Sequence, residues 1–311
     1  SFRLRSEEKY ENAMKNETFR GKSAVIDVGS NSVRLMLVAD GKVLYKTLDT
    51  TRLGEGIAFS PRLKEEAQER TANAIAAFKN RAEAEGAAIV YAYATAAVRE
   101  AENKDEFLRL VKEKSGIDLS VLSGEEEAAL GMSGALHSAD GATLDVGGAS
   151  TEIAVRHAGK IVYKKSVPLG VVRLKDLCGR DLRKIGELCE REAEEFCDAK
   201  DFLRLVCGNM TAIGGTATTL GAMKADLKEY DGKKVTGTKI TAVEMKIYAE
   251  KLLTLPVCEI EKFPCMPKKR ADVIGGGAAW IEALMRTLSL SEITVSDEDN
   301  LEGYAREKGL L

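Results

Sequence analysis

One short pattern occurs twice in this chain, each time at the end of an apolar run. Residues 27–32 read Asp-Val-Gly-Ser-Asn-Ser and residues 145–150 read Asp-Val-Gly-Gly-Ala-Ser, so both copies have the form D-V-G-x-x-S. The apolar runs at 24–27 and 142–145 are typical of strands. A strand that ends in Asp and turns through Gly and Ser brings a carboxylate, hydroxyls and backbone N–H groups close together, because Gly permits a tight turn.

The elements that follow the two copies have the same order, which favours two related domains over a chance match. Each copy leads into two further short strands, expected at 33–38 and 42–45 in the first half and at 150–155 and 161–165 in the second. Helices are expected after these strands in both halves. The sequence therefore predicts a duplicated α/β architecture.

The length of 311 residues suits two domains of about 100–200 residues each. We expect an N-terminal extension over 1–21, a first domain over 22–138 and a second domain over 139–311, packed and hinged without a long linker. A last strand is expected at 292–295, before a C-terminal helix. The sequence leaves open whether that helix packs back on the first domain.

Two further elements are predicted from local signals. Pro61 is expected at the first position of a helix that runs to about residue 85, because Pro is favoured there. The run at 204–207 predicts a strand before the helix that opens at Gly214. A further helix is expected from 125 to about 136.

The charge balance argues against nucleic acid polymers as partners. The 46 basic and 49 acidic residues give a net charge of −3, and only 5% of residues are aromatic, so neither a basic footprint nor a stacking platform is evident. No stretch approaches 18 apolar residues, and we expect no membrane partner. With two histidines in the chain, the general base is expected to be a carboxylate.

The six cysteines all lie between residues 178 and 265, and none forms a C-x-x-C pair. Several fall at apolar positions, so packing is favoured for most of them, in a reducing compartment. The charged N-terminus lacks the apolar segment of a signal peptide. We therefore expect a cytoplasmic protein.

Two facing D-V-G-x-x-S loops could hold neighbouring phosphates of a chain, with Mg²⁺ held by Asp directly or through water. A single loop of this kind is more typical of an ordinary hairpin turn. The recurrence favours phosphate binding. The residues expected to contact phosphate are Gly29, Ser30, Asn31, Ser32, Gly147, Gly148, Ala149, Ser150 and Thr151.

Seven segments carry a resemblance to a known family. They are 27–35, 94–101, 123–128, 145–152, 168–170, 214–217 and 269–272. In this order, along about residues 22–305, they resemble the exopolyphosphatase and guanosine pentaphosphate phosphatase (Ppx/GppA) family in its short two-domain form.

The resemblance implies two duplicated domains of the actin-like ATPase (ribonuclease H-like) fold, with mixed sheets and a site in the interdomain cleft. It implies release of terminal phosphates from polyphosphate or guanosine pentaphosphate, with Mg²⁺ or Mn²⁺, by a homodimer. The stretch Gly214-Gly215-Thr216 resembles the nucleotide-facing glycine loop of the wider fold, where a helix N-terminus can bind an anion. Close helix packing is the alternative interpretation of these glycines.

Glu127 matches the catalytic glutamate of the family, which would orient and deprotonate the attacking water. Taken alone, the Glu run at 125–127 is more typical of a solvated helix start, and Glu126 is close enough to be confused with Glu127. Arg99 is favoured as a second catalytic residue that stabilises phosphoryl oxygens over a surface ion pair. For Arg34 neither interpretation is favoured.

Asp145 and Glu152 match the acidic positions that would hold Mg²⁺ in the second loop, and Asp27 would help from the first loop. Without the family, Asp145 is typical of a turn and Glu152 of an exposed strand position. One departure stands out: Leu301 replaces an arginine that is usual in the family. This loss puts efficient processing of long polyphosphate in doubt.

The resulting hypothesis is a metal-dependent exopolyphosphatase with Glu127 as the base, acting on short chains in preference to long ones. Guanosine pentaphosphate is the alternative substrate. An ATP-using kinase or ATPase of the same fold, and a non-catalytic sensor of polyphosphate or an alarmone, are the remaining alternatives.

Overall fold

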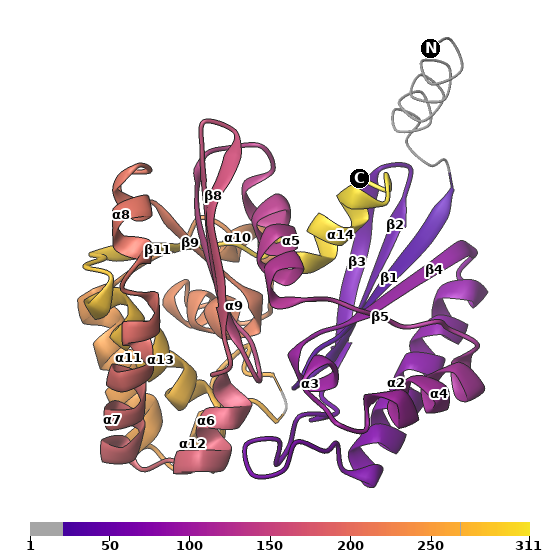
Figure 1. The fold of residues 1–311 in the computed structure, drawn as a ribbon, viewed down its shortest axis with the longest axis horizontal. Helices are drawn as coiled ribbons and strands as arrows, with labels where there is room; N and C mark the ends of the chain where they lie inside the picture. Colours follow the sequence, from indigo (N-terminus) through magenta and orange to yellow (C-terminus); the bar gives the residue numbers. More distant parts are fainter. Residues whose placement is uncertain (1–20, 268) are drawn as a thin grey trace.

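Two mixed β-sheets, one in each half of the chain, organise the molecule (Figure 1). This computed structural model describes residues 21–267 and 269–311, so all but one residue of the expected N-terminal extension lies outside the described residues. The first sheet has the order β3-β2-β1-β4-β5. Its strands are β1 (Lys22–Val28), β2 (Val33–Ala39), β3 (Lys42–Asp49), β4 (Ala87–Ala94) and β5 (Ser120–Val121).

The second sheet repeats this plan in the order β10-β11-β9-β6-β7-β8. In each sheet the first three strands along the chain pair antiparallel, and the fourth is parallel to the first. The β2–β3 pair has a register shift after Leu37, and the β7–β8 pair has one after Val155. These two positions are as many residues apart in the sequence as Asp27 and Asp145. The strands are β6 (Gly141–Val146), β7 (Thr151–His157), β8 (Lys160–Val167), β9 (Met210–Ile213), β10 (Lys239–Thr241) and β11 (Glu292–Val295).

Helices complete each domain, so two α/β domains with mixed sheets are present, as the sequence predicts (Figure 1). The first domain carries α2 (Glu65–Ala84), α3 (Ala96–Arg99) and α4 (Lys104–Ser115). The second carries α6 (Val171–Cys178), α7 (Leu182–Ala193), a 3₁₀ turn (Glu194–Phe196), α8 (Ala199–Arg204), α9 (Gly214–Lys224), α10 (Gly232–Val235), α11 (Ala242–Thr254), α12 (Val257–Ile260) and α13 (Ile274–Thr287).

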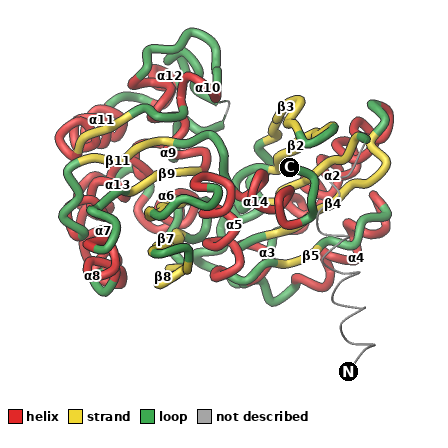
Figure 2. Tube along the Cα trace, turned by 90° about the horizontal axis from the view of Figure 1, so that it is seen from above, coloured by secondary structure: helices red, strands yellow, loops and turns green. Residues whose placement is uncertain are grey.

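Two helices, α5 (Gly124–Leu136) and α14 (Asn300–Glu307), lie between the domains (Figure 2). Ala128 and Met132 of α5 pack against Ala154 of β7 in the second sheet. Leu301 and other side chains of α14 join a core cluster with residues of β1 and β2. The C-terminal helix therefore packs on the first sheet. Helix α5 comes before residue 138 in the sequence, but it packs on the second sheet. The domain boundary near residue 138 therefore stays a prediction.

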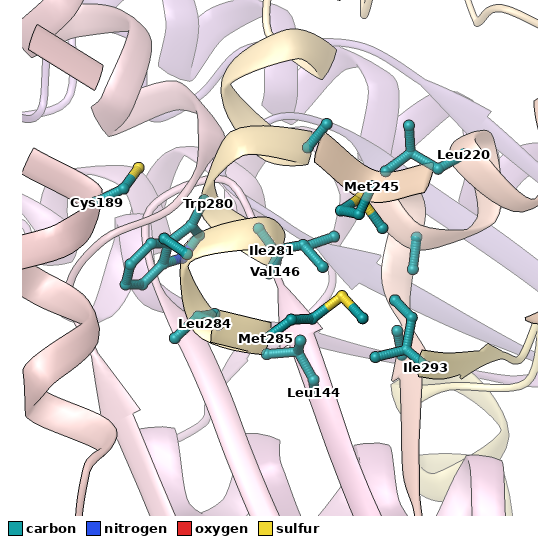
Figure 3. Close-up of a cluster of buried hydrophobic side chains, with 14 of the residues drawn as sticks. Leu144, Val146, Cys189, Leu220, Met245, Trp280, Ile281, Leu284, Met285 and Ile293 are labelled. Carbon is teal, nitrogen blue, oxygen red and sulfur yellow. The ribbon is translucent and has the colours of Figure 1, made fainter. Parts of the chain in front are cut away.

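The core of the second domain is built around α13 (Figure 3). Trp280, Ile281 and Leu284 of this helix are fully buried beside Leu144 and Val146 of β6, which ends at the second loop. Burial of large apolar side chains contributes about 1.5–3 kcal/mol each, so this packing gives the loop a rigid base.

Two predicted elements differ from the structure. Helix α2 begins at Glu65 rather than at Pro61, because the Leu63 N–H donates to the Asn103 side chain at 2.8 Å and Lys64 stays extended. The strand expected at 204–207 is wrong: Arg204 ends α8, and residues 205–207 form a turn with Cys207 at a positive φ of 55°. The strand before α9 is β9. Neither β10 nor α11 is predicted from the sequence.

The packing prediction holds for three of the six cysteines: Cys189 lies in the core of the second domain, and Cys178 and Cys265 are partly buried and pack against it. All six thiols are free, but only Cys189 is buried, and Cys207 and Cys258 are exposed. Their polar or open surroundings follow from the turns and short helices that carry them. Within 21–267 and 269–311, no helix combines the length and the apolar character that a membrane span requires.

Candidate active site

The two D-V-G-x-x-S loops both line one cavity of about 540 Å³ between the domains. Both loops close with the same hydrogen bond, since Gly29 N donates to Ser32 O and Gly147 N to Ser150 O, each at 3.0 Å. They approach so closely that a Cβ on Gly148 would lie 2.8 Å from the Ser30 Cβ. The predicted site residues that line the cavity are Asp27, Gly29, Ser30, Asn31, Ser32, Glu127, Asp145, Gly147, Gly148, Ser150, Gly214, Gly215 and Thr216.

Four predicted site residues lie behind the cavity wall. Ala149 is buried with core residues of the first domain. The Thr151 hydroxyl donates to Leu169 O at 2.6 Å and accepts from the Trp280 indole at 2.7 Å, so it has protein partners already. Glu152 is buried opposite Asp145 in the β6–β7 pair and accepts from Ser166 at 2.7 Å. Arg99 contacts Glu127 instead of the cavity.

The helix start at 125–127 distributes its three carboxylates to three different environments. Ser123 and Glu126 form a capping box, which fixes the first turn of α5. Glu125 pairs with Lys164 at the surface. Glu127 turns inward, is 7% exposed, and accepts from Arg99 Nη1 at 3.0 Å. Of these three residues only Glu127 lines the cavity.

Burial raises the pKa of Glu127 to about 7, against the opposing effect of the Arg99 charge. A carboxylate that titrates near neutral pH suits proton transfer, because it combines a useful ionised fraction with basicity. Burial also raises the pKa of Glu152 well above its ordinary value, with the charges of Glu127 and Asp145 adding to the effect. The cavity and its wall thus concentrate acidic groups that repel one another.

Asp145 and Asp27 bring carboxylate oxygens, which suit a divalent cation, to the cavity. Burial, together with the charges of Asp299 and Glu127, raises the pKa of Asp145 to about 7. Its neighbour Gly214 has a positive φ of 78°, and a side chain there would clash with Asp145 Oδ1. The Asp27 Oδ1 atom is buried without a hydrogen-bond partner among the described residues.

Within the described part of the chain, no three His, Cys, Asp or Glu side chains are grouped as a complete metal site. Mg²⁺ nevertheless fits the donors present, because this ion is commonly held by one or two carboxylates together with substrate phosphates and water. The mutual repulsion of the carboxylates favours such a cation.

Among the described residues, three cationic side chains line the cavity, and they differ in their partners. Arg34 donates through Nε to Asp27 at 2.9 Å and also pairs with Asp299. Lys46 pairs with Asp297 at 2.7 Å and also with Glu302 of α14. Arg270 forms no ion pair with any described residue, and its contact to the Thr219 hydroxyl is long, at 3.4 Å.

Arg270 is the cation best placed to receive an anion. Burial lowers its pKa to about 10, and the nearby Arg34 charge adds to this effect. The guanidinium covers Gly215, where any side chain would clash with it. The segment 269–272 contributes to the family resemblance, but the sequence predicts no role for Arg270.

Among the cavity residues that were not predicted, two lie at the start of α14, one as its N-cap and one as its first residue. Asp299 caps this helix in a capping box with Glu302, and Asn300 donates to Asp145 at 3.3 Å. The D-x-x-E capping signal was readable in the sequence. Their position at the site follows only from the packing of α14 between the domains.

Comparison with known proteins gives a consistent result. The model of the Ppx/GppA phosphatase family matches residues 37–308. Exopolyphosphatase 2 of Mycobacterium tuberculosis is 29% identical over 91% of this chain and 97% of its own length. The bifunctional 3-dehydroquinate synthase/phosphatase of Fusobacterium nucleatum is also 29% identical over 91% of this chain, which spans only 46% of that relative.

Solved structures agree with these matches. A Ppx/GppA family member from Aquifex aeolicus is 26% identical with a TM-score of 0.73, over 93% of this chain and 97% of its own. A structure described as an exopolyphosphatase from Cytophaga hutchinsonii has a TM-score of 0.83 over 93% of this chain and 99% of its own, at 23% identity, and supports the fold alone. The predicted architecture of two α/β domains with mixed sheets is confirmed.

Proposed function

Because this chain belongs to the Ppx/GppA phosphatase family and is thus a phosphatase-type hydrolase, we propose that it releases the terminal phosphate from inorganic polyphosphate. One observation carries the proposal: two duplicated glycine loops, the inward carboxylate of Glu127 and the guanidinium of Arg270 surround a single cavity. Backbone N–H groups and an unpaired arginine suit phosphoryl oxygens, and a buried carboxylate suits activation of water.

In this proposal Glu127 accepts a proton from the water that attacks the terminal phosphorus atom. Arg99 holds the carboxylate in place and keeps part of it ionised, as their 3.0 Å contact suggests. Arg270 and the loop N–H groups stabilise negative charge on the phosphoryl oxygens in the transition state. Arg99 then acts through Glu127 and does not touch the substrate.

Mg²⁺ or Mn²⁺, held by Asp145 with support from Asp27 and Glu152, would neutralise charge on the phosphate chain. The chemistry of these donors supports a hard cation, because all of them are carboxylate oxygens. Glu152 lies behind the cavity wall, so we assign it a supporting position next to Asp145.

Guanosine pentaphosphate is the second candidate substrate, and one feature of the cavity favours it. Part of the wall is apolar and lies next to Arg270, with Met266, Pro267 and Ile274 among its residues. A wall of this kind suits a flat base better than a bare phosphate chain.

The test is phosphate release measured in parallel on short polyphosphate, long polyphosphate, guanosine pentaphosphate and ATP, with Mg²⁺ or Mn²⁺. We expect release from polyphosphate to be fastest. Faster turnover of ATP would favour a kinase or ATPase, and tight binding without release would favour a sensor. No release from any substrate by folded protein would overturn the proposal.

A further inference from the structure

The turn before α13 is tied to the first domain by charged contacts beside the cavity. The Nη2 atom of Arg52 donates to the two carboxylate oxygens of Asp272, at 2.8 and 2.7 Å, and to Lys269 O at 3.0 Å. Lys175 of α6 pairs with the same carboxylate. Asp272 therefore joins a residue of the first domain to α6 of the second.

The backbone around Arg52 is hydrogen-bonded to the first D-V-G-x-x-S loop, residues 27–32; this loop and the loop at residues 145–150 are called the phosphate loops below. Arg52 N donates to Asn31 O at 2.9 Å, and Gly54 N donates to Ser30 O at 2.8 Å. Arg52 has a positive φ of 53°, a conformation that residues other than Gly rarely adopt and that persists only where surrounding contacts impose it. Arg52 is therefore hydrogen-bonded to the first loop through its backbone and to Asp272 through its side chain.

The same path ends at the cavity on the side of the second domain. Arg270 lies two residues before Asp272, and its carbonyl accepts from the backbone N–H groups of Val273 and Ile274 at 3.0 Å. Arg270 and Asp272 therefore belong to one rigid turn that leads into α13. Whatever fixes Asp272 also fixes the guanidinium that faces the phosphate loops.

We propose that Arg52 and Asp272 are positioning residues: their ion pair holds the Arg270 turn against the first phosphate loop and so sets the affinity of the site for a phosphate chain. This inference rests on the proposed function of the cavity. Without the ion pair, the arrangement with Arg270 facing the loops is only one of several. The apparent affinity is then the affinity of that arrangement multiplied by the fraction of molecules that adopt it.

The expected signature is an effect on KM more than on kcat. At saturating substrate the bound chain itself draws Arg270 and the loops together, so turnover recovers. At low substrate, molecules with a displaced turn bind poorly, so KM rises. A residue with a purely structural role would instead reduce the amount of active protein and leave KM unchanged.

The experiment compares the parent with Asp272→Asn, Arg52→Gln and the double variant, using short polyphosphate. The matched control is Glu69→Gln, which removes an ion pair with Lys114 inside the first domain. We expect each single variant to raise KM about tenfold with kcat within twofold of the parent. The double variant should be no worse than Asp272→Asn alone, because that substitution already removes the Arg52–Asp272 ion pair. The control should keep both constants within twofold.

Hydrogen exchange of the substrate-free protein provides a readout that does not need activity. Peptides that cover residues 50–54 and 269–273 should exchange faster in the Arg52 and Asp272 variants than in the parent or the control. An unchanged KM in folded variants, or additive effects in the double variant, would overturn the inference. If the parent releases no phosphate, the proposed function fails, and unchanged exchange in these two segments would separately overturn the positioning role.

Discussion

The carboxylate of Glu127 is separated from its two neighbours by helix geometry. Successive residues of a helix point in directions about 100° apart, so the cap, the surface and the interior each receive one of the three glutamates. The capping box commits Glu126 to the Ser123 N–H and hydroxyl, at 2.7 and 2.8 Å. Glu127 is left to face the cavity.

Glu127→Gln should lower kcat by a factor of about 10²–10⁴, because the amide cannot accept the proton of the attacking water. Steady-state phosphate release measures this effect, and calorimetry with tripolyphosphate should show that binding is retained. The control is Glu126→Gln, since Gln also serves in a capping box and this variant should keep nearly full activity. Equal activity in the parent and Glu127→Gln would remove Glu127 from the role of base.

The acidic cavity predicts an unusual dependence of stability on pH. Asp145 and Glu127 lose their protons near pH 4 when unfolded but only near pH 7 when folded. Between these values the folded state binds more protons, so these two groups reduce the free energy of unfolding as pH rises from about 4 to about 7. Above about pH 7 both carboxyl groups are ionised in the folded and the unfolded state, and the stability that they contribute at low pH is lost.

We therefore expect the Tm of metal-free protein to fall between pH 5 and pH 8 more steeply in the parent than in Asp145→Asn. Millimolar Mg²⁺ should raise the parent's Tm at pH 8 more than at pH 5, because a cation binds the ionised carboxylates. Thermal scans at both pH values measure this. The same Mg²⁺ response in Asp145→Asn would argue against Asp145 as a metal ligand.

Helices α5 and α14 approach each other through glycines. A Cβ on Gly134 would clash with Asp299 O, and one on Gly303 would clash with Leu130 O. Both neighbours are backbone atoms, which cannot move aside as a side chain can. This close crossing brings Asp299 and Asn300 to the cavity, so the two helices position part of the site.

Gly134→Ala should lower stability by about 1–3 kcal/mol, the usual cost of overpacking a tight contact. The matched control is Gly186→Ala in α7, where a Cβ meets nothing within 4 Å. This control should raise stability by about 0.5–1 kcal/mol, since Ala is favoured over Gly inside helices. Thermal unfolding of both variants measures the contrast, and a stabilised Gly134→Ala would contradict the backbone contact.

At the scale of the whole molecule, the net charge of −3 limits the substrates that suit the cavity. A long polyphosphate chain gains affinity from an extended basic surface, whereas here Arg34 and Lys46 are already paired with carboxylates. Leu301, in place of the expected arginine, is fully buried against the first sheet and adds no charge. Arg270 is then the principal free cation of the described cavity.

We expect kcat/KM to be higher for chains of a few phosphates than for chains of hundreds, at equal concentration of chain ends. Phosphate release on size-fractionated polyphosphate measures this preference, and it should be weaker at high salt, where charge effects are screened. Guanosine pentaphosphate serves as the short reference substrate. A marked preference for long chains would show that a basic path outside the cavity guides the polymer.

Local patterns in the sequence were sufficient for the repeated strands and loops, because a strand–turn–strand unit is specified by neighbouring residues. The family resemblance, and not the local pattern, singled out Glu127 and Asp145; both line one cavity, and their roles stay predictions. Local patterns failed at Pro61, where a contact to Asn103 delays the helix, and at 204–207, where an apolar run ends in a turn. Such contacts join residues far apart in the chain and leave no periodic signal.

By itself the sequence determined that the chain is duplicated, where the two glycine loops lie and which acidic residues are candidates for the site. Each of these depends on a few adjacent side chains. Only the tertiary structure decided which of these groups share the cavity. It put Thr151 into a hydrogen-bond chain with Trp280 and left Arg270 without an ion pair among the described residues. These outcomes depend on packing between elements distant in sequence, and packing is set by the whole fold.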